Sequence, residues 1–379
     1  MTVVSIFLFT ISGIVALVNE DRYRKISNLA KGLLWTLIYF FCQGIVMNTI
    51  ADGFHADYIP NFFWDTGFVA IGLSAFALIG CTTRELKLVI LIYFAVFVLD
   101  MLLTLKYLDL SGVLSSGDRR DAFRAVESGV GDTKNAVYIL HMILAQMFFL
   151  IFALCIEYIR KWKWILACIP FMLLTLYLGV FYQKRFVFAE FALFLSVFIM
   201  APSAKESMKG ILSKIIILVL GIIAGVVAYN NKTVSFLFGL VGNRFLEGAE
   251  KGAGFERFDE TAHFFAQYDF YYYIFGRGFT SFVTGAEGGN NLHLGMGNFI
   301  LKGGYIILTL FTVMLVISFF KGIWNLWSTN RRFDLWISTY VLLAIYTYLS
   351  FWGWFPNIIF VSLAILSSDF TKNFNYQNK

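Results

Sequence analysis

Long apolar stretches recur along the whole chain and constrain its fold more than any other feature. Backbone polar groups inside a bilayer must be satisfied within their own segment, which leaves the helix as the structure for such runs. Only 14% of the residues are charged, whereas a soluble protein carries about a quarter. The sequence therefore predicts an all-α, polytopic transmembrane helix bundle of about eleven spans, forming a single integral membrane domain over residues 1–379. Runs near the spanning length of about 17–25 residues lie at 2–18, 33–50, 62–80, 88–105, 137–158, 164–181, 186–201, 211–229, 294–320, 335–350 and 351–368.

The positions of Lys and Arg indicate the orientation of this bundle. They concentrate in the short loops that follow alternate spans, such as residues 22–31 and 160–163, and such loops stay in the cytoplasm. We therefore expect a bacterial inner-membrane protein with a periplasmic N-terminus and a cytoplasmic C-terminus. Two long polar segments then face the periplasm: a first loop at 106–136 and a large late loop at 230–293, which contains short amphipathic helices. No GxxxxGK[ST] motif occurs, which disfavours ATP-driven transport by this chain alone.

One short outer loop departs from this charge rule. Lys184 and Arg185 lie between the sixth and seventh predicted spans, on the periplasmic side. Their side chains could simply extend to the membrane interface, or they could bind an anion, for which phosphate is the natural candidate near a membrane. Glu190, just inside the seventh span, is a further candidate because a carboxylate within a membrane is costly and often functional.

The segment at 257–304 is the most unusual part of the chain, since it is charged, aromatic and rich in glycine. Arg257 and Arg277 in this segment, together with Arg244 earlier in the large late loop, are candidate anion-binding residues. Its aromatic belt at 264–275, which includes Tyr272, suits an element at the headgroup interface. Glu256, Glu260 and His263 would share one helical face, which could hold a divalent metal or could equally be a solvated surface. No metal and no cofactor are predicted.

His293 is the candidate general base, because an imidazole titrates near neutral pH and can accept a proton from an attacking hydroxyl. It lies in a glycine-rich sequence at the mouth of a predicted outer-facing span end. A structural role is the alternative for a single histidine of this kind.

The pattern resembles the bacterial O-antigen polymerases (Wzy type) and the related O-antigen ligases. That family has a basic residue at the start of a middle helix, matched in type by Lys184 and Arg185, and arginines in the large late loop, matched by Arg244 or Arg257. It also has a Gly-x-Gly-aromatic turn, matched at residues 276–279, and a histidine with a glycine eleven residues later, matched by His293 and Gly304. The chain departs from the family at Leu294, where Asn is usual, and Asn298 is the residue that could compensate.

The resemblance implies a glycosyltransferase that polymerises lipid-linked surface polysaccharide at the periplasmic face, independently of metal and with inversion of the anomeric centre. His293, Arg185 and Arg257 would be catalytic. The residues expected to bind substrate are Lys184, Arg244, Arg277, Glu190, Tyr272 and Asn298. The expected partners are a polyprenyl-pyrophosphate-linked oligosaccharide donor and acceptor and the lipid bilayer, together with a chain-length regulator and a flippase. Nucleic acid is not expected.

Three alternatives stay open from the sequence. An O-antigen ligase would perform the same chemistry with lipid A core as the acceptor. A flippase or transporter of lipid-linked glycans would place cations along its spans, whereas here they gather at the outer end. A structural membrane component would leave Lys184, Arg185 and Glu190 unexplained.

Overall fold

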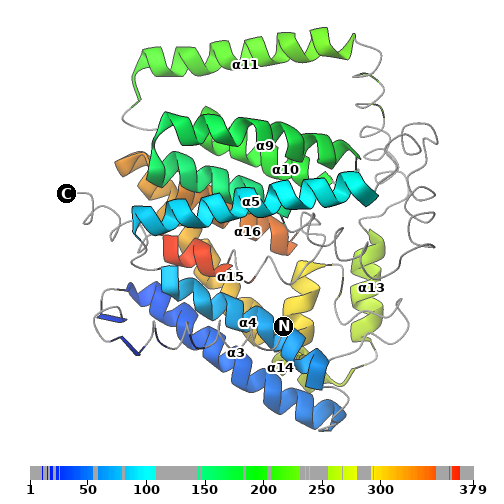
Figure 1. Ribbon diagram of the computed structural model, residues 1–379. Helices are drawn as coiled ribbons and strands as arrows, with labels where there is room; N and C mark the ends of the chain where they lie inside the picture. The colour runs from blue at the N-terminus through cyan, green and yellow to red at the C-terminus, as the bar shows by residue number, and fades with distance from the viewer. Residues whose placement is uncertain are drawn as a thin grey trace. The chain divides into compact units, whose positions relative to one another are not determined.

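A computed structural model describes residues 23–53, 59–78, 82–107, 144–181, 185–230, 255–279 and 292–367, together with a few positions at 11–19, 235 and 239. Within these ranges, residues 25, 146, 203–205, 267, 293, 347–357 and 359–360 are not described. Every element in the described ranges is a helix and none is a strand (Figure 1). The prediction of an all-α fold is therefore confirmed.

The described helices coincide with most of the apolar runs seen in the sequence. The predicted run at 294–320, for example, begins one residue before its helix, which extends from Gly295 to Thr329. The predicted loop at 106–136 and much of the late loop at 230–293 lie outside the described residues. The bounds of the α-helices are α3 (Asn28–Asp52), α4 (Ile59–Ser74), α5 (Thr83–Tyr107), α9 (Trp162–Phe181), α10 (Arg185–Phe194), α11 (Met208–Tyr229), α13 (Phe255–Phe265), α14 (Phe270–Phe275), α15 (Gly295–Thr329) and α16 (Phe333–Tyr346).

Two of these helices, α3 and α15, are long and apolar enough to cross a membrane by length and composition. Side chains exposed along α15 include Val313, Phe320 and Trp324, as expected of a surface that faces lipid. A shorter 3-10 helix, η2 (Ala75–Leu78), follows α4, and two π-helical segments, η3 (Cys155–Ile159) and η4 (Leu195–Met200), end further apolar helices. The full number of spans stays a prediction.

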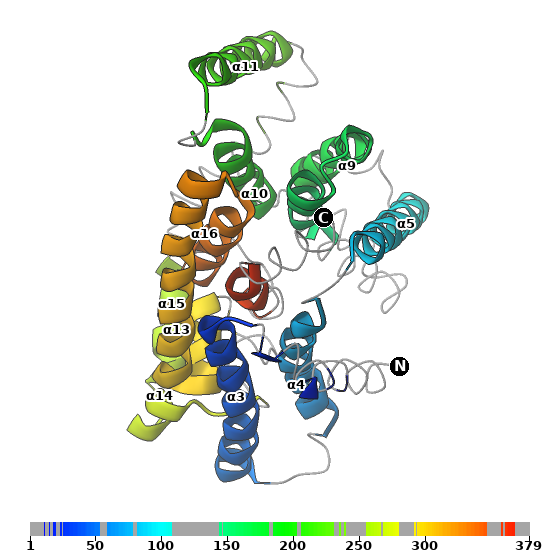
Figure 2. The same cartoon turned by 90° about the vertical axis from the view of Figure 1, so that its left-hand side faces the viewer.

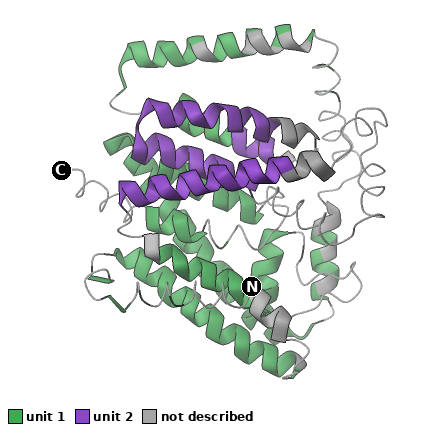
Figure 3. Cartoon of the chain, viewed as in Figure 1, with its two compact units in different colours: residues 1–81, 192–379 green, residues 82–191 purple. Residues whose placement is uncertain are grey.

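The chain divides into two compact units (Figure 3). Unit 1 comprises Met1–Cys81 and Ala192–Lys379, and unit 2 comprises Thr82–Phe191. In unit 2, the Phe171 ring of α9 stacks on Phe94 of α5 at 4.4 Å between ring centroids and meets Phe97 at 5.4 Å. Aromatic packing thus joins α5 and α9, the two longest helices of that unit.

In unit 1, helix α15 contacts α3, α14 and α16 (Figures 1 and 2). Its far end turns at Asn330, which adopts the left-handed conformation and donates its N–H to Asn325 and Leu326 carbonyls. Gly322 allows α16 to approach closely, because a Cβ there would lie 2.7 Å from the Leu335 backbone. Helix α15 is therefore the element around which unit 1 is organised.

Two short helices lie in the late segment that the sequence marked as unusual. Helix α13 packs against the start of α15, since a Cβ on Gly297 would come within 3.1 Å of the Thr261 side chain. Helix α14 is joined to α13 by the Tyr273 hydroxyl, which donates to the Phe265 carbonyl, and by the ring contact of the same two residues at 5.3 Å. The segment is thus folded onto the start of α15 at this point.

Candidate functional site

The residues at 276–279, Gly-Arg-Gly-Phe, form a turn that we call the glycine turn. It follows α14 and lies against α3 and the start of α15 in unit 1 (Figure 2). Gln43 of α3 donates its side-chain amide to the Phe275 carbonyl just before the turn. The Phe279 ring lies 5.0 Å from the Phe40 ring, also on α3. The turn is therefore fixed to a helix that precedes it by more than 200 residues in the sequence.

Close backbone approach explains two glycines of this region. Gly276 has φ +73° and a Cβ there would lie 2.5 Å from the Gly303 nitrogen. Gly304 has φ +68° and a Cβ there would clash with the Ile274 carbonyl. Both positions need a conformation that L side chains rarely adopt and a space that no side chain fits. The glycine turn and residues 303–304 consequently meet backbone to backbone.

A kink in α15 supplies the hydrogen-bond acceptors for this turn. Gly304 is non-helical within α15, so the carbonyls of the preceding turn are released from regular helical bonding. The Arg277 N–H donates to the Leu301 carbonyl at 2.6 Å, and the Gly278 N–H donates to the Lys302 carbonyl at 3.3 Å. The kink and the glycine turn therefore satisfy one another's backbone groups.

The Arg277 side chain extends from the glycine turn to two tyrosines. Its Nη1 donates to the Tyr268 hydroxyl at 2.7 Å. The guanidinium carbon lies 4.6 Å from the Tyr268 ring centroid and 5.9 Å from that of Tyr272. Such cation–π contacts orient a guanidinium without neutralising its charge. Arg277 is half-buried, and a guanidinium in this setting is suited to binding phosphate oxygens.

Asn298 holds the backbone on both sides of His293. The Leu292 N–H donates to its Oδ1 at 2.8 Å, while its Nδ2 donates to the carbonyls of Leu292 at 2.6 Å and Leu294 at 3.3 Å. The Asn298 side chain is fully buried. These bonds fix the entry to α15, and a direct contact between Asn298 and substrate stays a prediction. His293 itself lies outside the described residues.

Several predicted site residues converge on the start of α15. Arg257 lies in α13, which packs against Gly297, and Arg277 is bonded to Leu301. The residues on both sides of His293 lie at the same end of this helix. The helix that carries Arg257, the backbone of Arg277 and the residues that flank His293 thus all contact the first turns of α15, although they are spread over about 40 residues of sequence. The side chain of Arg257 lies outside what the structure describes.

The remaining predicted site residues are only partly described. Arg185 is the first residue of α10, with its side chain not described, and Lys184 and Arg244 lie outside the described residues. Glu190 belongs to unit 2 and is 1% exposed. It lies close enough to Tyr93 to interact with it electrostatically, as does Asp100. Glu190 is therefore buried in this structure, and its contact with substrate stays a prediction.

Helix formation by α13 supports the predicted spacing of Glu256, Glu260 and His263 on one face. The two carboxylates lie among the side chains that are not described, and His263 is exposed. A search of the described residues for groups of three or more His, Cys, Asp or Glu that could hold a metal ion finds none. The absence of a metal site stays a prediction for this face.

The sequence reading missed Tyr268, Gln43 and Lys302 as individual residues. Gln43 and Lys302 are each 8% exposed or less and lie within apolar helices. Polar residues in such positions are costly, and that cost is the signal that could have identified them. Tyr268 was included only as a member of the aromatic belt at 264–275.

Comparisons with protein-family models, with curated proteins and with solved structures give no match for this chain.

Proposed function

We propose that this protein is a polytopic inner-membrane polymerase of lipid-linked surface polysaccharide. It would cross the membrane about eleven times, with the N-terminus in the periplasm and the C-terminus in the cytoplasm. The proposal is supported most directly by the convergence at the start of α15, where Arg277, the helix that carries Arg257 and the backbone around His293 meet. Cations and a general base near the start of this helix would suit transfer from a pyrophosphate donor.

In the proposed reaction, a hydroxyl oxygen of the acceptor glycan attacks the anomeric carbon of the donor. The new glycosidic bond forms as the bond between that carbon and the pyrophosphate oxygen breaks. The hydroxyl proton passes to His293, and the electron pair leaves with polyprenyl pyrophosphate. Attack opposite the leaving group inverts the anomeric centre.

Arginines would contribute most in the transition state of this reaction. Negative charge grows on the pyrophosphate as the bond breaks, so a guanidinium held in advance stabilises the transition state more than the bound donor. Arg277 is oriented by Tyr268 and Tyr272, and we assign it to the pyrophosphate. Arg257 is proposed as a catalytic cation and Arg244 as a substrate-binding one, and Arg185 and Lys184 keep the catalytic and substrate-binding roles that the sequence predicts.

The experiment that tests this function begins with deletion of the gene, followed by gel analysis of surface glycan. We expect the polymer ladder to collapse to a single repeat and the wild-type gene to restore it. An unchanged ladder in the deletion strain would overturn the proposal. Complete loss of surface-attached glycan would replace it with the ligase or flippase alternative.

Arg277→Ala tests the assigned residue in the same strain. We expect polymer formation to fall about 100- to 1000-fold, the effect of removing one preorganised charge-stabilising donor, while the amount of folded protein in the membrane stays near wild type. Arg160→Ala is the matched control, because Arg160 is 67% exposed and lies in unit 2. Full restoration by Arg277→Ala would show that this guanidinium does not act on the leaving group.

A further inference from the structure

Lys302 is a fully buried cation at the kink of α15, with none of its side chain exposed. It is among the largest completely buried side chains of the described structure. Burial of an ammonium group is costly unless hydrogen bonds and charges compensate it. An apolar residue would fill the same volume without that cost, so the presence of a lysine calls for a specific role.

Two contacts of Lys302 join it to the glycine turn. Its Nζ donates to the Phe279 carbonyl at 3.0 Å. Its own carbonyl accepts the Gly278 N–H at 3.3 Å. One residue of α15 therefore binds two adjacent residues of the turn, once through its side chain and once through its backbone.

These two bonds act on the residues that immediately follow Arg277. The Arg277 N–H is bonded to Leu301, the neighbour of Lys302, so three consecutive residues of the turn are held by two consecutive residues of the helix. A hydrogen bond from a charged donor is roughly twice as strong as a neutral one. Lys302 also reaches the Phe279 carbonyl from within the helix, which a short polar side chain at that position would not do.

We propose that Lys302 is a positioning residue for Arg277. Its side-chain amine donates to the Phe279 carbonyl and so stabilises the glycine turn. This turn positions the Arg277 backbone, from which the side chain extends to Tyr268 and Tyr272. The consequence for activity rests on the proposed function, whereas the positioning itself does not.

The positioning is tested by hydrogen–deuterium exchange of the purified full-length protein in lipid nanodiscs. In Lys302→Met, we expect the amides at 277–278 to exchange about ten- to a hundredfold faster, as follows from losing one buried hydrogen bond to a charged donor. Lys321→Met is the matched control, since it makes the same substitution at an exposed position of the same helix. Unchanged exchange at 277–278 in Lys302→Met would overturn the proposal.

A second variant covers the case in which Lys302→Met does not accumulate. Lys302→Gln removes the charge and keeps a neutral donor, and we expect it to accelerate exchange of the same amides to a smaller extent. If Lys302→Met does not fold and the amides at 277–278 exchange at the wild-type rate in Lys302→Gln, the proposal is also overturned. A neutral donor would then be enough to hold the glycine turn.

A double-mutant cycle tests whether the positioning acts through Arg277. We expect Lys302→Met to lower polymer formation at least tenfold, and the double variant with Arg277→Ala to be no less active than Arg277→Ala alone. If Lys302 had only a structural role, the activity losses of the two single variants would multiply in the double variant. That result would overturn the proposal. If gene deletion leaves the glycan ladder unchanged, the proposed function fails while the exchange experiment still decides the role of Lys302.

Discussion

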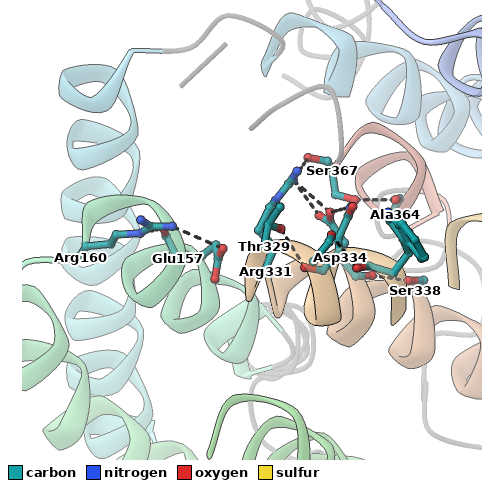
Figure 4. Close-up of polar contacts among 11 residues, drawn as sticks. Glu157, Arg160, Thr329, Arg331, Asp334, Ser338, Ala364 and Ser367 are labelled. Carbon is teal, nitrogen blue, oxygen red and sulfur yellow. Dashed lines mark hydrogen bonds and ion pairs between the residues drawn. The ribbon is translucent and has the colours of Figure 1, made fainter. Parts of the chain in front are cut away.

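An arginine lies near each end of α15, and the partners of these two arginines differ. Beyond its last residue, Arg331 meets the Asp334 carboxylate at 3.0 Å and donates to the Ser367 carbonyl at 3.2 Å (Figure 4). Asn325 donates to the same carboxylate at 2.7 Å. Arg332 donates to the Phe198 carbonyl at the end of η4. Asp334 is 2% exposed, so a largely buried ion pair stabilises this end of the helix.

At the other end, the described partners of the Arg277 side chain are tyrosines. Tyr268 accepts a hydrogen bond and presents its ring, and Tyr272 presents a second ring. These contacts orient the guanidinium on aromatic rings, whereas at the far end the Asp334 carboxylate pairs with the charge of Arg331. The comparison teaches that one arginine is held by an ion pair between helices, while the other is oriented by aromatic rings of the segment that precedes α15.

Gly304→Ala should produce the largest effect of the variants that probe this comparison. The substitution places a Cβ against the Ile274 carbonyl in a left-handed conformation, so we expect destabilisation of about 3 kcal/mol or more. Thermal unfolding of the purified protein in detergent measures it. Gly221→Ala on α11 is the control, because a Cβ there meets nothing within 4 Å. Equal unfolding temperatures for the two variants would contradict the backbone contact.

Asp334→Asn should have the next largest effect and should act on stability alone. It removes the charge that holds Arg331 in a largely buried site, with an expected loss of about 2–3 kcal/mol. Polymer formation per folded molecule should stay at the wild-type level, in contrast to Arg277→Ala. The control is Asp259→Asn, an exposed carboxylate on α13, measured by the same unfolding assay. Loss of activity without loss of stability would erase the distinction between the two ends of α15.

Tyr268→Phe should have the smallest effect. The variant keeps the ring under Arg277 and removes only the hydroxyl that accepts from Nη1. We expect polymer formation to fall about five- to tenfold, in line with roughly 1 kcal/mol for one such bond. Tyr271→Phe, at a 40% exposed position of α14, provides the control for the assay of polymer length and amount. Identical activity in both variants would show that the ring contact suffices to orient Arg277.

Much of this arrangement was predictable from the sequence, and some of it was not. The long apolar runs located α3, α5, α9, α11 and α15, because a single segment of that length forms a helix in lipid. The glycines at 276, 278 and 304 were also recognised, as part of a pattern. Their pairing was not, because close approach between segments 26 residues or more apart depends on how α14 and α15 pack.

The buried polar residues show the same limit. Glu190 was chosen for its cost within a span, and it is buried beside Tyr93 and Asp100 in unit 2. Lys302 carries a similar cost but was not among the predicted site residues. Its role became visible only through its bond to the Phe279 carbonyl.

The sequence by itself determined that this chain is helical and apolar, and that a charged, glycine-rich segment precedes α15. Those properties follow from local composition and from the backbone's need for hydrogen bonds within each segment. The tertiary structure alone decided that Arg277 lies against tyrosines while Arg331 pairs with Asp334. Which partner an arginine meets depends on the packing of helices around the kink at Gly304 and the turn at Asn330, and no local pattern encodes that packing.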